Sequence, residues 1–269
     1  MRSVWIILKE QVNNFYLVRR LSLYELKSAN RNNYLGILWE IINPMIQIGI
    51  YWFVFGFGIR GSGKHYNIDS IPFHHWLFAG FVIWFFINQA IVQGSKSIYS
   101  RIRTIAKMSF PLSVIPTYVI VSKFYQHLMF LAVIYVILLL SGESVSVYIV
   151  QLPYFMFAVL MFVIALSLIT STLATIVRDV QMIVQSIVRM LLYLTPVLWT
   201  SKNALVQTVM LINPITYVVD GYRAALLGTS WYGVAHWHYT IYFWTVTLAM
   251  LIIGSVLHLR FRDHFVDYL

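Results

Sequence analysis

Long apolar runs, separated by short polar stretches, fill most of this chain. A helix needs about 20 mainly apolar residues to cross the hydrocarbon core of a bilayer. Six runs meet this requirement, over roughly 35–58, 74–93, 113–140, 148–176, 180–200 and 238–259. The stretch 201–230 is also largely apolar, but Asn213-Pro214, Asp220 and Arg223 interrupt it. The pattern predicts an all-α membrane protein with six transmembrane helices within residues 35–269.

Two basic segments have apolar positions at helical spacing. In residues 5–28, apolar side chains alternate with charged ones, which predicts an amphipathic helix lying in the membrane interface within the N-terminal segment 1–34. Residues 95–107 predict a second, shorter helix between spans two and three. Its apolar positions are Ile98, Ile102 and Ile105, with Arg101 and Arg103 among the basic residues around them. Such a helix rests on anionic lipid or docks a soluble partner, and the pattern fits both.

Composition supports the membrane assignment. The chain is 60% hydrophobic and only 10% charged, whereas ordinary soluble domains carry about 25% charged residues. It contains no cysteine, which excludes disulfides and thiolate metal sites. The excess of 19 Lys and Arg over 9 Asp and Glu follows the positive-inside rule rather than indicating nucleic acid.

Charge also sets the orientation. With both termini cytoplasmic, thirteen Lys and Arg fall in inner segments and four in outer ones. This asymmetry predicts an N-in, C-in topology in which residues 201–230 enter the outer leaflet and return, between spans five and six. Backbone of this kind needs protein or a water-filled cavity around it.

The stretch FGFGIRGSGKHY (55–66) places Gly58, Gly63 and Lys64 at the spacing of a phosphate-binding P-loop. His65 stands where the motif requires Ser or Thr. The segment also follows a predicted span on the outer side, where it would not meet cytoplasmic ATP. The sequence therefore predicts no nucleotide site and no enzymatic activity in this chain.

Polar residues repeat along one face of two predicted spans. The first stripe contains Glu40, Asn43, Gln47 and Tyr51, and the second contains Gln181, Gln185, Arg189 and Tyr193. Polar groups at membrane depth usually face a bundle interior or an aqueous path. The two stripes predict either the lining of a translocation path or interhelical packing.

Other polar residues have two interpretations each. Lys123 either extends to the cytoplasmic surface or pairs with Glu40, which is also a candidate partner for Arg189. The pairs His74-His75 and His236-x-His238 suggest a zinc-dependent outer enzyme, but no catalytic motif accompanies them, so interfacial histidines and no metal are the expectation. A basic cluster either attracts a lipid diphosphate or only sets topology; it comprises Arg19, Arg20, Lys27 and Arg31.

Three segments resemble one family. NNYLGILWEIINPMIQIGIYWFVFG (32–56) is similar to the first span of type-2 ABC exporter permeases that move cell-surface polysaccharides, with Leu35-Gly36, Trp39 and Pro44 in place. LLYLTPVLWT (191–200) and LINPITYVVDGYRAALLG (211–228) resemble its fifth span and outer re-entrant segment. Within the family, ELKSANRNNYLGILWEIINPM most resembles wall teichoic acid export permeases.

The resemblance implies a permease dimer in a bacterial plasma membrane with two cytoplasmic ATPase subunits, which bind the ATP and Mg²⁺. The helix at 95–107 then corresponds to the coupling helix on the ATPase, and the N-terminal helix to the interface helix. The channel forms mainly from spans one and five, which carry the two polar stripes. The implied substrate is wall teichoic acid, or another glycan such as O-antigen or capsule, attached to undecaprenyl diphosphate; a small-molecule exporter of the same fold stays open.

Overall fold

The computed structural model is helical, apart from a minimal hairpin of β1 (Asn67–Ile68) and β2 (Ile71–Pro72). It describes residues 2–29, 31–58, 67–68, 71–101, 111–142, 145–201, 203–262 and 265. Five helical segments in this part of the chain are long and apolar enough to cross a membrane: Gly36–Phe55, Phe73–Ser95, Val114–Leu140, Val147–Ile176 and Trp237–Phe261. They match five of the six predicted spans, and the multi-pass membrane assignment is confirmed.

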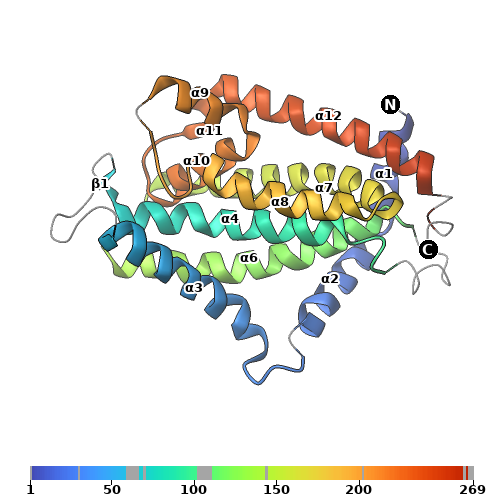
Figure 1. Ribbon diagram of the computed structural model, residues 1–269, viewed down its shortest axis with the longest axis horizontal. Coiled ribbons are helices and arrows are strands. Elements are labelled where there is room, and N and C mark those ends of the chain that lie inside the picture. Colours follow the sequence, from blue (N-terminus) through green and yellow to red (C-terminus); the bar gives the residue numbers. More distant parts are fainter. Residues whose placement is uncertain are drawn as a thin grey trace.

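The centre of the bundle is formed by α4 (Phe73–Ser95), which packs on both α6 (Val114–Leu140) and α7 (Leu152–Ile176). The short helix η3 (Val147–Gln151) leads into α7, and α12 (Trp237–Phe261) runs along it. Helix α1 (Arg2–Asn13) and the last turn of α12 lie at one end of the bundle, here named the terminal end, and β1 lies at the opposite, hairpin end (Figure 1). This shared end agrees with the expected even number of crossings; which side is cytoplasmic stays a prediction.

The predicted fifth span, 180–200, is shorter than expected. Helix α8 (Asp179–Leu194) has 16 residues, about 24 Å at 1.5 Å per residue, and Thr195 is extended, with φ −106° and ψ 143°. Pro196 follows it, and a residue before proline is driven out of the helical region. Helix α8 therefore ends at Leu194, and among the residues that the structure describes only a bent helix pair could supply a sixth crossing of the required length.

That bent pair is α9 (Ala204–Ile212) and α10 (Pro214–Leu226), which meet at 101°. Asn213 makes the corner: its Oδ1 accepts a hydrogen bond from Ile215 N at 3.0 Å, and its Nδ2 donates to Thr195 Oγ1 at 2.9 Å. Pro214 occupies the first turn of α10, where its missing N–H costs nothing. Together with α11 (Tyr232–Ala235), the pair gathers at the hairpin end (Figure 1), the shape that a re-entrant segment requires.

The N-terminal segment forms two helices, α1 (Arg2–Asn13) and α2 (Phe15–Ala29), rather than one. Helix α1 packs on α12 and α2 packs on α6. The buried residues of α2, Val18, Ser22 and Leu26, follow at four-residue intervals on one face. The protein's own helices cover one face of each helix, whereas Trp5, Leu8, Val12 and Phe15 are exposed. A position of this segment in the membrane interface stays a prediction.

Helix α3 (Trp39–Trp52) stands apart from this bundle. It follows the short helix η1 (Gly36–Leu38), continues as a π-helix, η2 (Phe53–Gly58), and makes limited contact with α4 and α6 of the bundle (Figure 1). Only 11% of its apolar window is buried, against 67% for α4. An apolar span with so little cover within its own chain leaves a wide surface for lipid, substrate or another subunit.

Candidate functional site

The first polar stripe lies on the poorly covered helix α3. Asn43 and Gln47 are exposed, and Gln47 Nε2 lies 3.5 Å from Asn43 Oδ1, a weak hydrogen bond within the stripe. Tyr51 turns toward the bundle and stacks on Phe81 of α4, with ring centroids 5.0 Å apart. The middle of the stripe therefore faces away from the chain's own core.

The second stripe lies on α8, whose other face buries Val184 and Val188. Arg189 is exposed, and its Nε donates to Gln185 O of its own helix at 3.3 Å. The stripes approach each other through Tyr51 and Tyr193, which interact electrostatically. Both alternatives for the stripes remain open, because a path between two copies and packing against a second copy would each use such exposed polar faces.

At the terminal end of α8, Gln181 Oε1 accepts a hydrogen bond from Tyr99 Oη at 2.6 Å. Burial raises the pKa of Tyr99, an effect that Arg178 opposes. The phenol therefore stays a neutral donor at physiological pH. This contact joins α8 directly to the turn that follows α4, so Gln181 is held by the chain itself rather than left free in the stripe.

Glu40 and Lys123 lie at the same crevice. The two side chains, on α3 and α6, line one small crevice, and Glu40 is the strongest electrostatic partner of Lys123. Gln89, Gln126 and His127 complete its polar wall. Of the two partners considered for Glu40, Lys123 is the one that shares this crevice with it.

The segment after α4 was predicted to be a helix over residues 95–107, but its described part is not helical beyond Ser95. Residues 96–101 form turns, and Ile102, Arg103 and Ile105 lie outside the described residues. Ile98 is fully buried among Val18, Val114 and Phe265 of the same chain. It therefore anchors the turn internally and is not an exposed docking contact. Helix α2 and the start of α6 cover its side chain, which the sequence pattern had predicted to be exposed.

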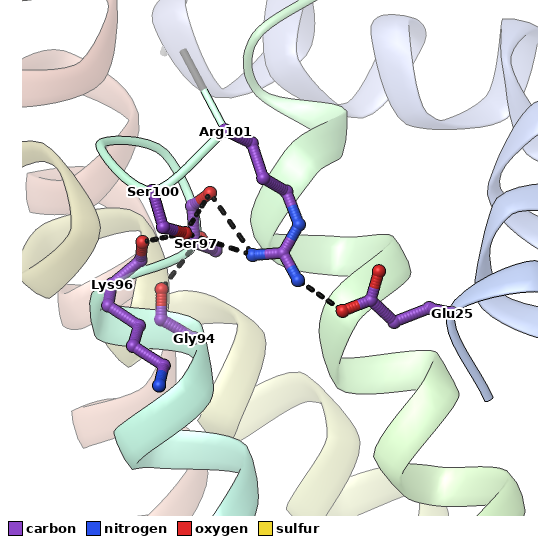
Figure 2. A network of polar contacts seen from close by, with 6 residues as sticks. All are labelled: Glu25, Gly94, Lys96, Ser97, Ser100 and Arg101. Atoms are coloured by element: carbon purple, nitrogen blue, oxygen red, sulfur yellow. Dashed lines mark hydrogen bonds and ion pairs between the residues drawn. The ribbon is translucent and has the colours of Figure 1, made fainter. Parts of the chain in front are cut away.

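Arg101 ties this turn to the N-terminal helices (Figure 2). Its guanidinium forms an ion pair with Glu25 of α2 and also donates to Ser100 Oγ at 3.1 Å. The same group lies 5.8 Å from the ring centroid of Tyr118 on α6. Arg101, expected to dock an ATPase, is thus first a connector among α2, α6 and the turn.

The four residues of the basic cluster are exposed on α2 and in the turn after it: Arg19, Arg20, Lys27 and Arg31. A second ion pair joins the N-terminal helices to the end of α12: Arg262 Nη1 lies 3.0 Å from Glu10 Oε1 of α1. Exposure leaves the cluster available to anionic groups from outside the chain. Whether it binds substrate or only sets topology stays a prediction.

Arg223 is the residue that sequence reasoning misplaced. Counted as an outer-loop cation, it is only 6% exposed within α10. Its Nη1 lies 3.2 Å from Asp220 Oδ1, its Nε donates to Trp76 O, and its Nη2 donates to Val197 O. An Asp and an Arg three residues apart in a helical segment were the only sequence signal for this anchor, which joins α10 to α4 and to the segment after α8.

The histidine pairs do not assemble. Within the described part of the chain, no group of three or more His, Cys, Asp or Glu side chains is placed to hold a metal ion. His75 is buried at the start of α4, whereas His236 and His238 are exposed around the start of α12. The geometry gives no support to the alternative of a zinc-dependent enzyme.

Comparison with known proteins settles the class of this molecule. A profile described as ABC-2 type transporter matches residues 16–227, which is most of the chain and includes both polar stripes. The chain belongs to the ABC-2 type transporter family. It is thus a membrane permease of that family, and its similar relatives are transport subunits rather than enzymes.

Three relatives give a finer comparison, and each is named O-antigen export system permease protein RfbA. The one from Myxococcus xanthus is 28% identical over 204 residues, covering 74% of this chain and 76% of the relative. Two from Klebsiella pneumoniae are 23% and 24% identical over 248 residues, covering 91% of this chain and 92% of each relative. The similarity confirms polysaccharide export permeases as the matching group, and none of the three is a teichoic acid permease.

Proposed function

We propose that this ABC-2 permease moves a lipid-linked polysaccharide from the inner to the outer leaflet. The observation that supports it best is the similarity, over nine-tenths of the chain, to two O-antigen export permeases. The substrate is a glycan on undecaprenyl diphosphate, closer in kind to O-antigen than to the wall teichoic acid that ELKSANRNNYLGILWEIINPM suggested. Both polymers share the lipid diphosphate anchor, so the same path would serve either.

The proposed transporter contains two copies of this chain and two ATPase subunits that bind the ATP and Mg²⁺. Helices α3 and α8 expose Asn43, Gln47, Arg189 and Tyr193 of their polar stripes, which suits a path closed by a second copy. Glycan hydroxyls exchange hydrogen bonds readily with the exposed amides of Asn43 and Gln47, with the half-buried amide of Gln185, and with the Arg189 guanidinium. The basic cluster on α2 would attract the diphosphate electrostatically.

The ATPase would dock at the terminal end, on exposed residues of the turn after α4 and on the basic residues Arg101 and Arg103. Ile98 would act there indirectly, by holding the turn in place. Motion of the ATPase would then reach α2 through the Arg101–Glu25 ion pair. This gives the N-terminal helices a mechanical connection to nucleotide hydrolysis.

The test begins with purification of the tagged chain from its native membrane in mild detergent, followed by mass spectrometry of what accompanies it. A stoichiometric ATPase subunit with a complete P-loop is expected. The complex is then reconstituted in vesicles with a fluorescent undecaprenyl-diphosphate glycan, and ATP-dependent exposure to an added glycosidase is measured. ATPase activity that is stimulated by free amphiphiles but not by the lipid-linked glycan would instead identify a small-molecule exporter.

A further inference from the structure

A polar crevice lies between α3, α4 and α6. It has a volume of about 20 Å³ and is walled by Glu40 and Pro44 of α3, Gln89 of α4, and Lys123 and Gln126 of α6. This space accepts one water molecule but not a phosphate group. Any larger ligand has to displace part of the wall.

Gln126 has unused hydrogen-bonding capacity at this crevice. Its side chain is only 5% exposed, and neither its Oε1 nor its Nε2 has a hydrogen-bond partner among the described residues. A buried amide left unsatisfied costs about 1–3 kcal/mol, so such groups usually meet water or a ligand. The crevice wall therefore presents an unused donor beside the ammonium group of Lys123.

The charges around Lys123 come from several elements. Glu40 of α3 is its strongest attractive partner and Glu25 of α2 the second, while Lys96 and Arg101 of the turn repel it. Of these groups, Glu40 sits on the helix with the least cover in the bundle. The crevice that holds Lys123 therefore includes a carboxylate on a helix with little cover in the bundle.

We propose that this crevice binds one phosphate of a lipid-linked diphosphate, with Lys123 and Gln126 Nε2 as ligands and Glu40 as the group displaced. Lysine recognises phosphate as a point charge, and hydrogen bonds to an ionised acceptor are stronger than neutral ones. The incoming anion takes over the ammonium group, and its charge repels the Glu40 carboxylate. Because Glu40 is fixed to α3, substrate binding moves α3 away from α6.

The position of the crevice suits this role. Lys123 lies about 14 Å along α6 from Val114 at 1.5 Å per residue, within the half of the span nearer the terminal end. The exposed basic cluster of α2 lies at the same end. A lipid headgroup that binds the cluster would next meet Lys123, which lies further inside the membrane span. The inference rests on the proposed function, because that function supplies the diphosphate.

The test measures binding of fluorescent farnesyl diphosphate to the purified full chain, with any ATPase subunits that accompany it, in detergent. Lys123→Gln is expected to weaken binding at least tenfold, and Glu40→Gln to strengthen it by removing the competing carboxylate. Gln126→Leu should weaken binding severalfold. The matched controls are Lys9→Gln and Gln207→Leu, which change exposed residues on α1 and α9 and should leave affinity unchanged.

Two further arms define the ligand. Farnesol should bind the Lys123→Gln variant and the wild-type chain equally, and inorganic diphosphate should compete only weakly. Competition by inorganic diphosphate at equal affinity would overturn the lipid as the source of the phosphate. Lys123→Arg keeps the charge and should keep most of the affinity, so the proposal stays testable even where Lys123→Gln fails to fold.

Unchanged affinity in Lys123→Gln, or weaker binding in Glu40→Gln, would refute the site. Glycan transport in vesicles separates this failure from a failure of the proposed function. If the wild-type chain transports lipid-linked glycan while Lys123→Gln binds farnesyl diphosphate normally, only the crevice assignment is wrong. If the wild-type chain neither binds farnesyl diphosphate nor transports the glycan, the proposed function is wrong as well.

Discussion

Arg223 of α10 lies over the indole ring of Trp76 on α4, with its guanidinium carbon 3.5 Å from the ring centroid. The contact joins the bent helix pair to the centre of the bundle, since Arg223 also donates hydrogen bonds to Trp76 O and Val197 O. A buried guanidinium with this many partners fixes the position of α10, because each partner restricts where the helix can lie. The shape of the hairpin end therefore depends on one side chain.

Arg223→Ala should destabilise the folded chain by about 3 kcal/mol, because it removes a buried cation and leaves Asp220 without its ion-pair partner. Thermal unfolding in detergent, followed by the loss of monodisperse protein, measures the change. Arg260→Ala alters an exposed arginine of α12 and serves as the control. Equal stability of the two variants would show that the hairpin end does not depend on Arg223.

Gly80→Ala tests the same contact from the other side. A Cβ at Gly80 would lie 2.4 Å from Arg223 Nη2, so the guanidinium must leave its place. We expect a loss of about 1–3 kcal/mol, the usual cost of overpacking a core. Gly49→Ala is the matched control, because a Cβ there meets nothing within 4 Å. A stability of Gly80→Ala equal to that of Gly49→Ala contradicts the packing described here.

The sequence predicts most of the architecture and little of the side-chain pairing. The hydrophobic runs give five of the six spans, because the length of an apolar run needs no tertiary information. The corner at Asn213-Pro214 is also visible, since both residues act locally. The early end of α8 before Thr195 follows from Pro196 in the same way. The apolar residues after Pro196 nevertheless extend the hydrophobic run, so the run alone predicts a longer helix.

The side-chain contacts depend on residues far apart in the chain. The sequence offers both Lys123 and Arg189 as partners of Glu40. Only the position of α3 shows that Glu40 shares a crevice with Lys123. Ile98 has the pattern of an exposed docking face, and only the packing of α2 shows that the face is covered. Arg223 belongs to a polar interruption that the sequence places outside the bundle, while its burial depends on contacts with Trp76 of α4 and with Val197 in the segment after α8.

The Glu25–Arg101 ion pair should matter for export more than for stability. Its two side chains are 31% and 24% exposed, and a partly exposed pair contributes about 1 kcal/mol or less. Arg101→Gln should therefore leave unfolding nearly unchanged while it uncouples α2 from the turn and lowers ATP-dependent glycan export. The exchanged variant Glu25→Arg with Arg101→Glu should recover part of the export, since it restores the pair with reversed charges. Failure of the exchange to recover any export would assign Arg101 to direct contact with the ATPase.

Arg189→Ala should reduce glycan export without preventing assembly of the transporter. The side chain is exposed and its hydrogen bond is to its own helix, so its loss leaves the fold of α8 intact. If the exposed face of α8 lines the path, the missing cation weakens contact with the diphosphate or the glycan during passage. Export in vesicles and copurification of the ATPase measure the two properties separately. Normal export would favour packing as the role of the α8 stripe, whereas loss of the assembled complex would place Arg189 at the interface between subunits.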